Sequence, residues 1–460
     1  MAITPVVAIF DVGKTNKKIF LFDSQYKIVY EKSARFTETV DEDGDDCENL
    51  ESLRLSVFDS LREVCRLKEF CIKAVNFSAY GASLVYIDEE GNPLTPLYNY
   101  LKEYPAPLRK KFYETYGGEQ SFAHITASPA LGSLNSGMQL YRIKYERPEL
   151  FQKIKYALHL PQYLSYLLSG IPCSDITSIG CHTNLWNFHD NAYHLWVSQE
   201  GILEKLAPVF PGNQVLPAAF PGGNYTVGIG IHDSSAALIP YLVNFHEPFV
   251  LISTGTWCIS LNPFNQTPLT DEELENDCLC YITYMGKPVK AARLFAGYEH
   301  ELQVKRIAEH FNQNPIRYRN IGYDEGIITR LHKKIPPQNI RVNLKESAFA
   351  QRDLSQFKTD TEAYHQLMLD IIAQQSFSTR LVWQGSKTTR IFVDGGFGKN
   401  ALYMNLLAAY FPEAEVFAAS MAQATAVGAA LSIHEAWNKN ALPNDIIELQ
   451  YSARSHEINL

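Results

Sequence analysis

The order of apolar and polar residues predicts strands and helices that alternate along the chain. Apolar runs predict three consecutive strands over residues 5–36 and a further strand over residues 72–80. Between them, over residues 50–67, apolar positions recur at helical spacing. Residues 136–170 are expected to be helical in two pieces, split near two prolines. Strands followed by a helix and another strand indicate an α/β unit rather than an all-β domain.

A second set of elements repeats this plan after a stretch rich in Pro and Gly over residues 205–224. A new strand begins at Phe249, and a long helix is expected over residues 360–384. A strand over residues 390–393, a glycine turn, a helix and another strand follow, and a last helix is expected over residues 424–438.

Length and composition limit the classes of protein that fit. Because 460 residues exceed what one hydrophobic core usually supports, we expect two domains, residues 1–245 and 246–460. A net charge of -9 without a basic run argues against a nucleic-acid partner. We expect a cytoplasmic protein, since no signal peptide or membrane-spanning run is visible and the eight scattered cysteines suit buried thiols in a reducing compartment.

Two similar glycine turns, residues 11–16 and 253–257, each lie between two apolar β-type runs. Such a hairpin tip offers backbone N–H groups and hydroxyls, which are the donors that hold a phosphate. The expected phosphate ligands are Gly13, Lys14, Thr15, Asn16 and Lys18 at the first turn and Thr254, Gly255 and Thr256 at the second. Asp11 ends the strand before the first turn and is expected to hold Mg²⁺. The alternative is an ordinary hairpin in which Asp11 caps a turn.

Two further segments carry candidate chemistry. In residues 227–237 a glycine-rich strand end leads into Asp233 at the start of a helix of small residues, where a carboxylate is either a general base or a helix cap. In residues 392–400 a strand ends in a glycine turn before a helix, which permits close approach of a nucleotide. The nucleotide ligands expected there are Gly395, Gly396, Lys399 and Asn400.

In their order and spacing these motifs resemble those of the FGGY family of carbohydrate kinases, over about residues 5–438. The resemblance implies an α/β fold of two RNase H-like (actin-like ATPase) domains, with ATP and sugar in the interdomain cleft. Asp233 matches the family's catalytic aspartate, which implies that it deprotonates the sugar hydroxyl that attacks the γ-phosphate of ATP. ATP and Mg²⁺, the latter near Asp11, are therefore the expected cofactors.

The resemblance also implies a set of sugar ligands: Tyr80, Gly81, Ser83, Asn135, Gln139, His232 and Asp233. The Tyr80-Gly81 pair and the Asn135 and Gln139 spacing are similar to those of the rhamnulose and fuculose kinases. We therefore expect phosphorylation of a terminal hydroxyl of a 6-deoxy-ketose such as L-fuculose or L-rhamnulose. Ser83, however, stands where those kinases carry an acid, which leaves another pentulose or a polyol (xylulose, ribulose) as alternatives.

Two other classes of function are also compatible with the glycine turns. One is an actin-like ATPase switch that moves a protein client and needs neither Asp233 nor a sugar pocket. The other is a sugar-binding regulator that has lost turnover. The expected partners are a small sugar and ATP, with no nucleic acid and no membrane, and a homodimer is left open as the assembly.

Overall fold

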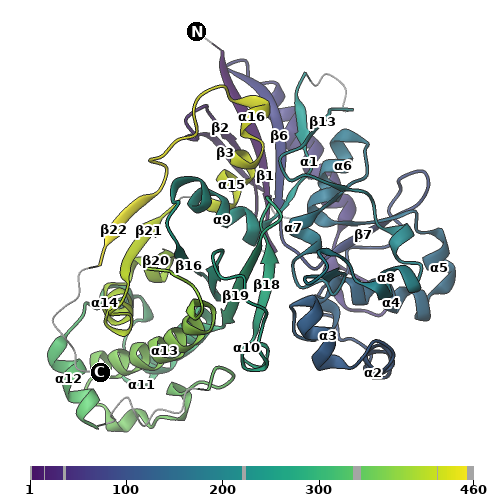
Figure 1. Cartoon of the computed structure of the whole chain (residues 1–460). Helices are drawn as coiled ribbons and strands as arrows, with labels where there is room; N and C mark the ends of the chain where they lie inside the picture. Colours follow the sequence, from purple (N-terminus) through teal and green to yellow (C-terminus); the bar gives the residue numbers. More distant parts are fainter. Residues whose placement is uncertain are drawn as a thin grey trace. The chain divides into compact units, whose positions relative to one another are not determined.

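The computed structural model has the mixed α/β architecture that the sequence predicts, with helices packed around two sheets (Figure 1). The described residues are 3–14, 16–34, 38–219, 224–334, 343–421 and 423–452. Contacts between residues group the chain into two compact units. The first unit comprises residues 1–244, 280–288 and 423–446, and the second comprises residues 245–279, 289–422 and 447–460. The domain limits expected from the sequence, at residues 245 and 246, stay a prediction.

The sheet of the first unit is built on the three consecutive N-terminal strands, which confirms that prediction. Its strand order is β13 (Val215–Pro217), β14 (Thr226–Gly228), β6 (Phe70–Ala79), β1 (Thr4–Val12), β2 (Lys17–Phe22) and β3 (Ile28–Ala34), and β15 (Ile231–His232) also pairs with β6. β1 runs antiparallel to β2 and parallel to β6. The middle of β1 is buried on both faces, as its continuous apolar run predicts.

Helices cover both faces of this sheet. The apolar sides of α1 (Leu50–Cys65) and α6 (Leu160–Ser169) pack with side chains of β1 and β6 in one core cluster. α15 (Ala424–Ser432) contacts β1, β6 and α9 (Asp233–Asn244). α1 confirms the helix predicted near residue 50.

The segment 136–170 differs from the two helical pieces expected. It contains α4 (Ser136–Glu146), α5 (Pro148–Lys153), the strand β8 (Tyr156–His159) and α6. A proline lies in the first turn of both α5 and α6, where its missing N–H costs no helical hydrogen bond, so each proline begins a helix rather than merely interrupting one. The short strand between them pairs with β7 (Leu84–Ile87), a contact distant in sequence.

The remaining elements of the first unit are short. They are β4 (Glu38–Val40), β5 (Asp46–Glu48), β9 (Ser174–Asp175), β10 (Trp186–Asn187), β11 (Ala192–Tyr193), β12 (Val209–Phe210), α2 (Ala106–Thr115), α3 (Glu119–Thr126), α7 (Ile176–Ile179), α8 (Leu195–Gln199), α16 (His434–Trp437), η1 (Gly132–Leu134) and η2 (Leu203–Lys205). Of these, α2, α3, α7 and α8 pack with α4, β7 and β8 in a second core cluster that is rich in aromatic residues. The single last helix expected over residues 424–438 is thus divided into α15 and α16 at Ile433.

The sheet of the second unit has a long buried helix against it. Its strand order is β19 (Pro288–Leu294), β17 (Cys258–Asn262), β16 (Phe249–Thr254), β20 (Arg390–Gly395), β21 (Glu415–Ser420) and β22 (Glu448–Tyr451), and β18 (Cys278–Ile282) extends it at β19. The helices are α10 (Asp271–Glu275), α11 (Ala296–His310), α12 (Glu325–Lys334), α13 (Asp360–Trp383) and α14 (Ala401–Tyr410), with η3 (Pro315–Asn320), η5 (Phe349–Gln351), η6 (Leu354–Gln356) and η7 (Phe397–Lys399). α13 and β20 confirm the predicted long helix and the strand after it.

Within the described ranges, no helix combines the length and the apolar character needed to span a membrane.

Candidate active site

The first glycine turn closes the β1–β2 hairpin. Asp11 lies opposite Lys18 in the antiparallel register, and the N–H of Gly13 donates to the carbonyl oxygen of Asn16 at 2.9 Å. This hydrogen bond leaves Lys14 and Asn16 at the hairpin tip, partly or fully exposed. Thr15, the other predicted ligand at the tip, lies outside the described residues.

Asp11 is held at the end of β1 by α15. Its Oδ2 accepts a hydrogen bond from the hydroxyl of Thr425 at 2.9 Å. Burial raises the pKa of Asp11 to about 6; the Thr425 bond opposes that rise, and the negative charge of Asp233 adds to it. Asp11 is paired with Ser78 of β6, and His232 with the next residue, Ala79, so Asp11 and Asp233 lie at the same end of the sheet of the first unit.

Asp233 is the first residue of α9, as the sequence predicts. Its Oδ1 accepts a hydrogen bond from the backbone N–H of Ser234 at 2.6 Å and lies 3.3 Å from Nε2 of His232. Partial burial raises the pKa of this carboxylate to about 6 although its side chain stays 31% exposed, and the two hydrogen bonds from Ser234 oppose that rise. A carboxylate with such a pKa is largely ionised at neutral pH and is still basic enough to accept a proton.

His232 packs between Gly81 and Asp233. Its Nε2 lies 3.4 Å from the sulfur of Cys181, and its backbone N–H donates to the hydroxyl of Thr177 at 3.0 Å. Burial lowers the pKa of His232 to about 4, so its ring is neutral at pH 7. The sequence does not predict Cys181 at this position, because nothing in the local pattern distinguishes it from the other buried thiols.

The predicted sugar ligands lie in the same unit but have different surroundings. Tyr80 and Gly81 directly follow β6, and the side chain of Ser83, directly before β7, is buried. Asn135 is fully buried: its amide donates to the carbonyl of His182 at 2.7 Å and its Oδ1 accepts from the N–H of Leu131. The structure therefore gives Asn135 a role in holding its own loop.

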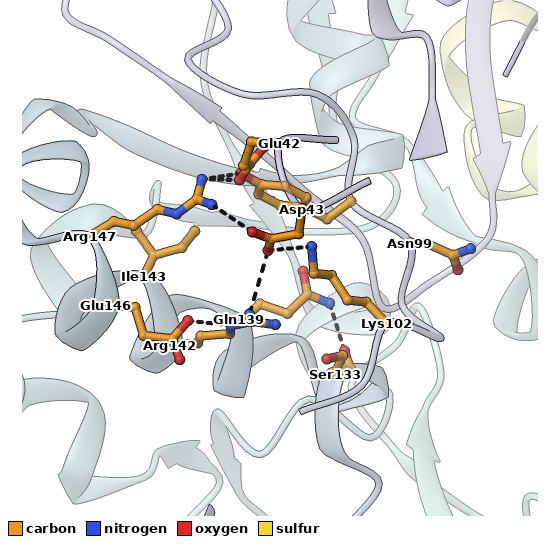
Figure 2. Close-up of a pocket in the computed structure, with 11 residues that line it drawn as sticks. Glu42, Asp43, Asn99, Lys102, Ser133, Gln139, Arg142, Ile143, Glu146 and Arg147 are labelled. Atoms are coloured by element: carbon orange, nitrogen blue, oxygen red, sulfur yellow. Dashed lines mark hydrogen bonds and ion pairs between the residues drawn. The ribbon is translucent and has the colours of Figure 1, made fainter. Parts of the chain in front are cut away.

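Gln139 connects α4 to the segment after β6. Its Nε2 donates to the carbonyl oxygens of Ala82 at 2.7 Å and Ser133 at 2.6 Å. Figure 2 shows Gln139 in a pocket whose other side chains are largely charged. The pocket lining comprises Glu42, Asp43, Tyr98, Asn99, Lys102, Ser133, Gln139, Arg142, Ile143, Glu146 and Arg147.

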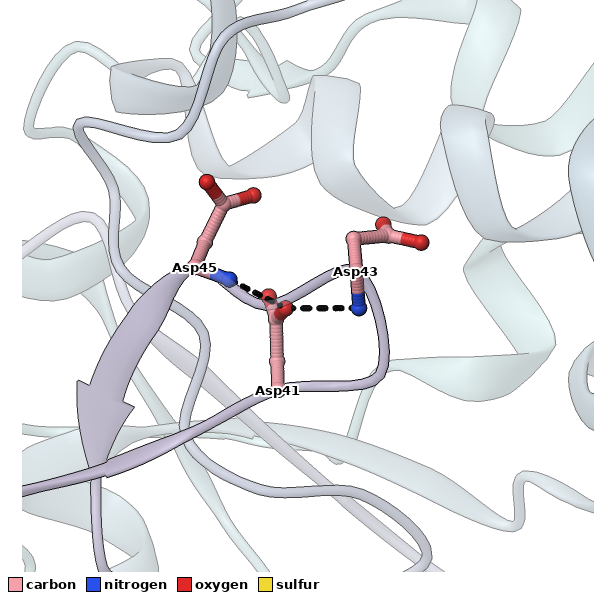
Figure 3. A group of neighbouring side chains, drawn as sticks. All are labelled: Asp41, Asp43 and Asp45. Carbon is pink, nitrogen blue, oxygen red and sulfur yellow. Dashed lines mark hydrogen bonds between the residues drawn. The ribbon is translucent and has the colours of Figure 1, made fainter.

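The acidic loop between β4 and β5 is organised around one lysine. The carboxylate of Asp41 accepts hydrogen bonds from the backbone N–H groups of Asp43 and Asp45 (Figure 3). Nζ of Lys102 lies 2.6, 2.7 and 3.0 Å from the carboxylates of Asp41, Asp43 and Asp45, respectively. The three carboxylates are grouped closely enough to bind a metal ion, but the Lys102 ammonium is already the cation among them. Arg147 forms ion pairs with Glu42 and Asp43, which fixes the same loop from the start of α5.

In the second unit, the second glycine turn (residues 253–257) is adjacent to the glycine turn within residues 392–400, which we call the third turn. β16 and β20 are parallel, with Thr254 opposite Gly395, and the Thr254 hydroxyl donates to the carbonyl of Asp394 at 2.6 Å. Gly395 has a φ of +94°, and a β-carbon there would lie 2.0 Å from the carbonyl oxygen of Thr254. Only glycine permits this approach, so the two predicted turns are built as one loop pair.

A cavity of about 550 Å³ opens beside this loop pair. Five predicted ligands lie in its lining: Thr254, Gly255, Gly396, Lys399 and Asn400. The lining also includes Phe397 of the predicted segment 392–400, together with Gly297, His300, Glu301, Arg319 and Tyr364, which the sequence motifs do not contain. The last five residues come from α11, η3 and α13, and no motif spacing connects these segments.

Polar side chains in this cavity form a short hydrogen-bonded chain. Nδ2 of Asn400 donates to the hydroxyl of Tyr364 at 2.9 Å, and that hydroxyl lies 3.1 Å from Nε2 of His300. Oδ1 of Asn400 caps α14 by accepting from the N–H of Tyr403. The volume and the mixed lining, with a lysine, an arginine and backbone turns, suit a phosphorylated ligand of nucleotide size. Thr256 lies at the exposed tip of the second turn.

Comparison with known proteins connects these features to one family. Residues 6–229 match the N-terminal domain of the FGGY family of carbohydrate kinases, and residues 246–441 match the carbohydrate kinase FGGY C-terminal domain. A rhamnulokinase of Klebsiella pneumoniae (strain 342) is 25% identical over 298 residues, which are 60% of this chain and 58% of that protein. The match thus spans less than two thirds of the curated relative's length.

Solved structures share the fold over nearly the whole chain. A carbohydrate kinase from Novosphingobium aromaticivorans has a TM-score of 0.79 at 22% identity and covers 98% of this chain and 95% of its own. A xylulose kinase from Lactobacillus acidophilus has a TM-score of 0.77 at 16% identity, with coverage of 97% and 93%. At these identities the likeness concerns the fold, which is the fold of FGGY kinases. Because the two domain matches together span most of its length, the chain belongs to the FGGY family of carbohydrate kinases.

Proposed function

We propose that this chain is an ATP-dependent kinase that phosphorylates a terminal hydroxyl of a ketose, with a 6-deoxy-ketose such as L-fuculose or L-rhamnulose as its substrate. The observation that carries the proposal is that Asp11 and Asp233 lie at the same end of one sheet: Asp11 is paired with Ser78 of β6, and His232, directly before Asp233, is paired with the next residue of β6, Ala79. Burial raises the pKa of each carboxylate to about 6. Phosphoryl transfer to an alcohol requires a metal ligand and a base of this kind.

Asp233 is the proposed general base. It accepts the proton of the sugar hydroxyl as that oxygen attacks the γ-phosphate in line. The neutral ring of His232, 3.3 Å from Asp233, orients the carboxylate and offers a polar group to the sugar. Tyr80, Gly81, Ser83 and Gln139 form the proposed acceptor side around it.

Asp11 is the proposed metal ligand. Carboxylate oxygens are preferred Mg²⁺ ligands, and the Thr425 hydroxyl holds this carboxylate in one orientation, so the residues fit a magnesium ion. When bound with ATP, Mg²⁺ neutralises charge on the phosphates. Asn16 and Lys18 of the first turn are proposed to bind phosphate oxygens beside it, and Gly13, whose N–H donates to Asn16, to hold the shape of the turn.

The cavity of the second unit is the proposed ATP site. It has a volume of about 550 Å³, and a β-carbon added at Gly396 would have no atom within 4 Å, so there is room for phosphates at the turn. Thr256 at the exposed tip of the second turn is proposed to bind phosphate oxygens, and Thr254 and Gly255, which donate hydrogen bonds to Asp394 and Trp257, are proposed to shape the turn beside them. Gly395, Lys399 and Asn400 are proposed to form the nucleotide side.

The similarity to a rhamnulokinase favours a 6-deoxy-ketose, and the fold shared with a xylulose kinase keeps xylulose, ribulose and polyols as alternatives. A coupled ADP-release assay over a panel of ketoses, aldoses and polyols tests the proposal. We expect sugar-dependent turnover that is fastest with L-rhamnulose or L-fuculose. ATP hydrolysis that no sugar stimulates would instead support an actin-like ATPase switch.

A further inference from the structure

Lys14 lies in a cage of side chains that the phosphate motif does not predict. Its Nζ lies 5.7 Å from the ring centroids of both Tyr80 and Tyr100 and 3.5 Å from Oε1 of Glu48. The two rings are themselves 6.0 Å apart and tilted. A cation within about 6 Å of an aromatic ring is attracted to its face. We call Lys14, Glu48, Tyr80 and Tyr100 the lysine cage.

Glu48 is the fixed member of the lysine cage. It ends β5, its side chain is only 6% exposed, and its backbone N–H donates to the carbonyl of Leu97 at 3.3 Å. Its two carboxylate oxygens face different lysines of the same turn: Oε2 lies 3.0 Å from Nζ of Lys17, and Oε1 faces Lys14. Because a buried carboxylate requires a compensating charge, Glu48 holds both lysines in place.

The segment before Glu48 is fixed as firmly. The loop between β4 and β5 is tied to Lys102 through Asp41, Asp43 and Asp45. Arg147 ties it to the start of α5 through Glu42 and Asp43 (Figure 2). Glu48 closely follows this loop in the chain. Its position therefore does not depend on Lys14, and it provides a rigid wall for the ammonium.

The lysine cage lies on the side of the turn where the acceptor is proposed to bind. Burial raises the pKa of Tyr80 well above its usual value, and Glu48 raises it further, whereas Ser83 lowers it. Burial also raises the pKa of Tyr100, and the negative charge of Asp233 raises it further. Tyr80 also directly precedes Gly81, where a β-carbon would lie 2.7 Å from Nε2 of His232, and that nitrogen lies 3.3 Å from Asp233. The lysine cage therefore lies beside the proposed base.

Lys18, the second lysine that the sequence predicts as a phosphate ligand, has different neighbours from Lys14. Nζ of Lys18 lies 2.6 Å from Glu31, on β3, and its charge lowers the pKa of Asp11. Lys18 therefore acts on the proposed metal ligand, while Lys14 points toward tyrosines of the proposed acceptor side. The two lysines, both expected from sequence to bind phosphate, are separated by the fold.

We propose that Lys14, held by Glu48 between Tyr80 and Tyr100, donates a hydrogen bond to a hydroxyl oxygen of the acceptor sugar rather than to a phosphate of ATP. The Lys14 side chain is 31% exposed. Its Nζ lies 3.5 Å from Oε1 of Glu48, which is longer than a usual N–H···O hydrogen bond, so its N–H donors are available to a ligand. Glu48 is then a positioning residue, and Lys14 is a determinant of acceptor specificity. This inference rests on the proposed kinase function.

The test uses Lys14→Met, which keeps the length of the side chain and removes the charge. Losing a hydrogen bond from a charged donor should raise the KM for the acceptor roughly tenfold to a hundredfold, with the KM for ATP changed less than about twofold. Glu48→Gln should also raise the KM for the acceptor, but by a smaller factor than Lys14→Met. Lys14→Arg should bind the acceptor more tightly than Lys14→Met does. Lys110→Met, on the exposed face of α2, is the matched control and should leave both constants unchanged.

Calorimetric titration with the best ketose of the panel, without ATP, gives a second readout that does not depend on turnover. We expect Lys14→Met to weaken that binding and ADP binding to stay as in the wild type. A variant that loses ATP or ADP affinity while keeping the acceptor KM overturns the inference, whereas a wild-type protein without any sugar-dependent turnover overturns the proposed function instead. Circular dichroism and thermal melting of each variant separate both results from misfolding.

Discussion

Gly81 and His232 approach each other so closely that a β-carbon at position 81 would lie 2.7 Å from Nε2 of His232. The same nitrogen lies 3.3 Å from the carboxylate of Asp233. The missing side chain at position 81 therefore determines where a neutral imidazole lies beside the proposed base. The aromatic-glycine pair Tyr80-Gly81 thus has a steric reason in addition to the sugar contact that the sequence indicates.

Gly81→Ala should push the ring of His232 away from its place and disturb Asp233. A misplacement of catalytic groups by about 1 Å costs on the order of a hundredfold in rate. We expect kcat to fall by roughly that factor while ATP affinity, measured by calorimetry, is retained. Normal kcat in this variant would mean that the position of His232 does not matter for turnover.

The raised pKa values of Asp11 and Asp233, each about 6, predict an acid limb in the pH profile. Both carboxylates must be ionised, one to bind metal and one to accept a proton, so kcat/KM should be constant above about pH 7 and fall below about pH 6. Because the two groups interact, the limb belongs to the pair, and its slope should exceed one. A profile flat down to about pH 5 would contradict these roles.

Asp233→Asn should separate catalysis from stability. In the folded protein the pKa of the Asp233 carboxyl lies above its ordinary value of 3.8, so the folded state binds the carboxyl proton more tightly than the unfolded chain does. The folded state therefore loses stability as pH rises from 3.8 to about 6. A neutral asparagine avoids that loss. We therefore expect a higher Tm than wild type at about pH 7.5 and a difference that shrinks toward about pH 4, which thermal melts at both pH values measure. A lower Tm of the variant at the higher pH would show that the ionised carboxylate stabilises the fold.

Gly395 and Gly396 form a matched pair at the third turn. A β-carbon at Gly395 would lie 2.0 Å from the Thr254 carbonyl oxygen and its φ is +94°, whereas Gly396 has a φ of -62° and open space beside it. Gly395→Ala should lower the Tm by an amount that corresponds to about 1–3 kcal/mol of backbone strain. Gly396→Val should keep the wild-type Tm and weaken ATP binding, because its side chain enters the proposed ATP site.

Calorimetry with ATP and thermal melting distinguish these two effects. If Gly396→Val binds ATP as well as wild type, the cavity beside it is not the nucleotide site. If instead Gly395→Ala keeps full stability, the close contact with Thr254 is relieved by a small shift.

The sequence predicts much of this fold because its local signals are strong. The apolar run of β1 and the helical spacing in α1 and α13 need no distant partner to be recognised. The prediction for the segment 136–170 is wrong at β8, a strand of four residues whose identity depends on pairing with β7. The division of the last helix at Ile433 likewise leaves no clear local signal.

In the candidate site, too, the residues in local motifs could be predicted and the residues placed by long-range packing could not. Asp11, Asp233 and the glycine turns lie in local motifs, so they could be predicted from their surroundings in the chain. Glu48 and Tyr364 could not, because one reaches the first turn from β5 and the other reaches its cavity from α13. Long-range packing places both, and a single sequence does not encode that packing in any short pattern.

The most direct test of the kinase proposal is to incubate the protein with ATP, Mg²⁺ and L-rhamnulose or L-fuculose and to follow both products by mass spectrometry. We expect the wild type to form a ketose monophosphate in amounts equal to the ADP released. Asp233→Asn should lower that rate at least about a hundredfold, as loss of a general base does, with ATP affinity nearly unchanged. ADP release without any sugar phosphate, or a variant with near-normal formation of the ketose phosphate, would contradict the assignment.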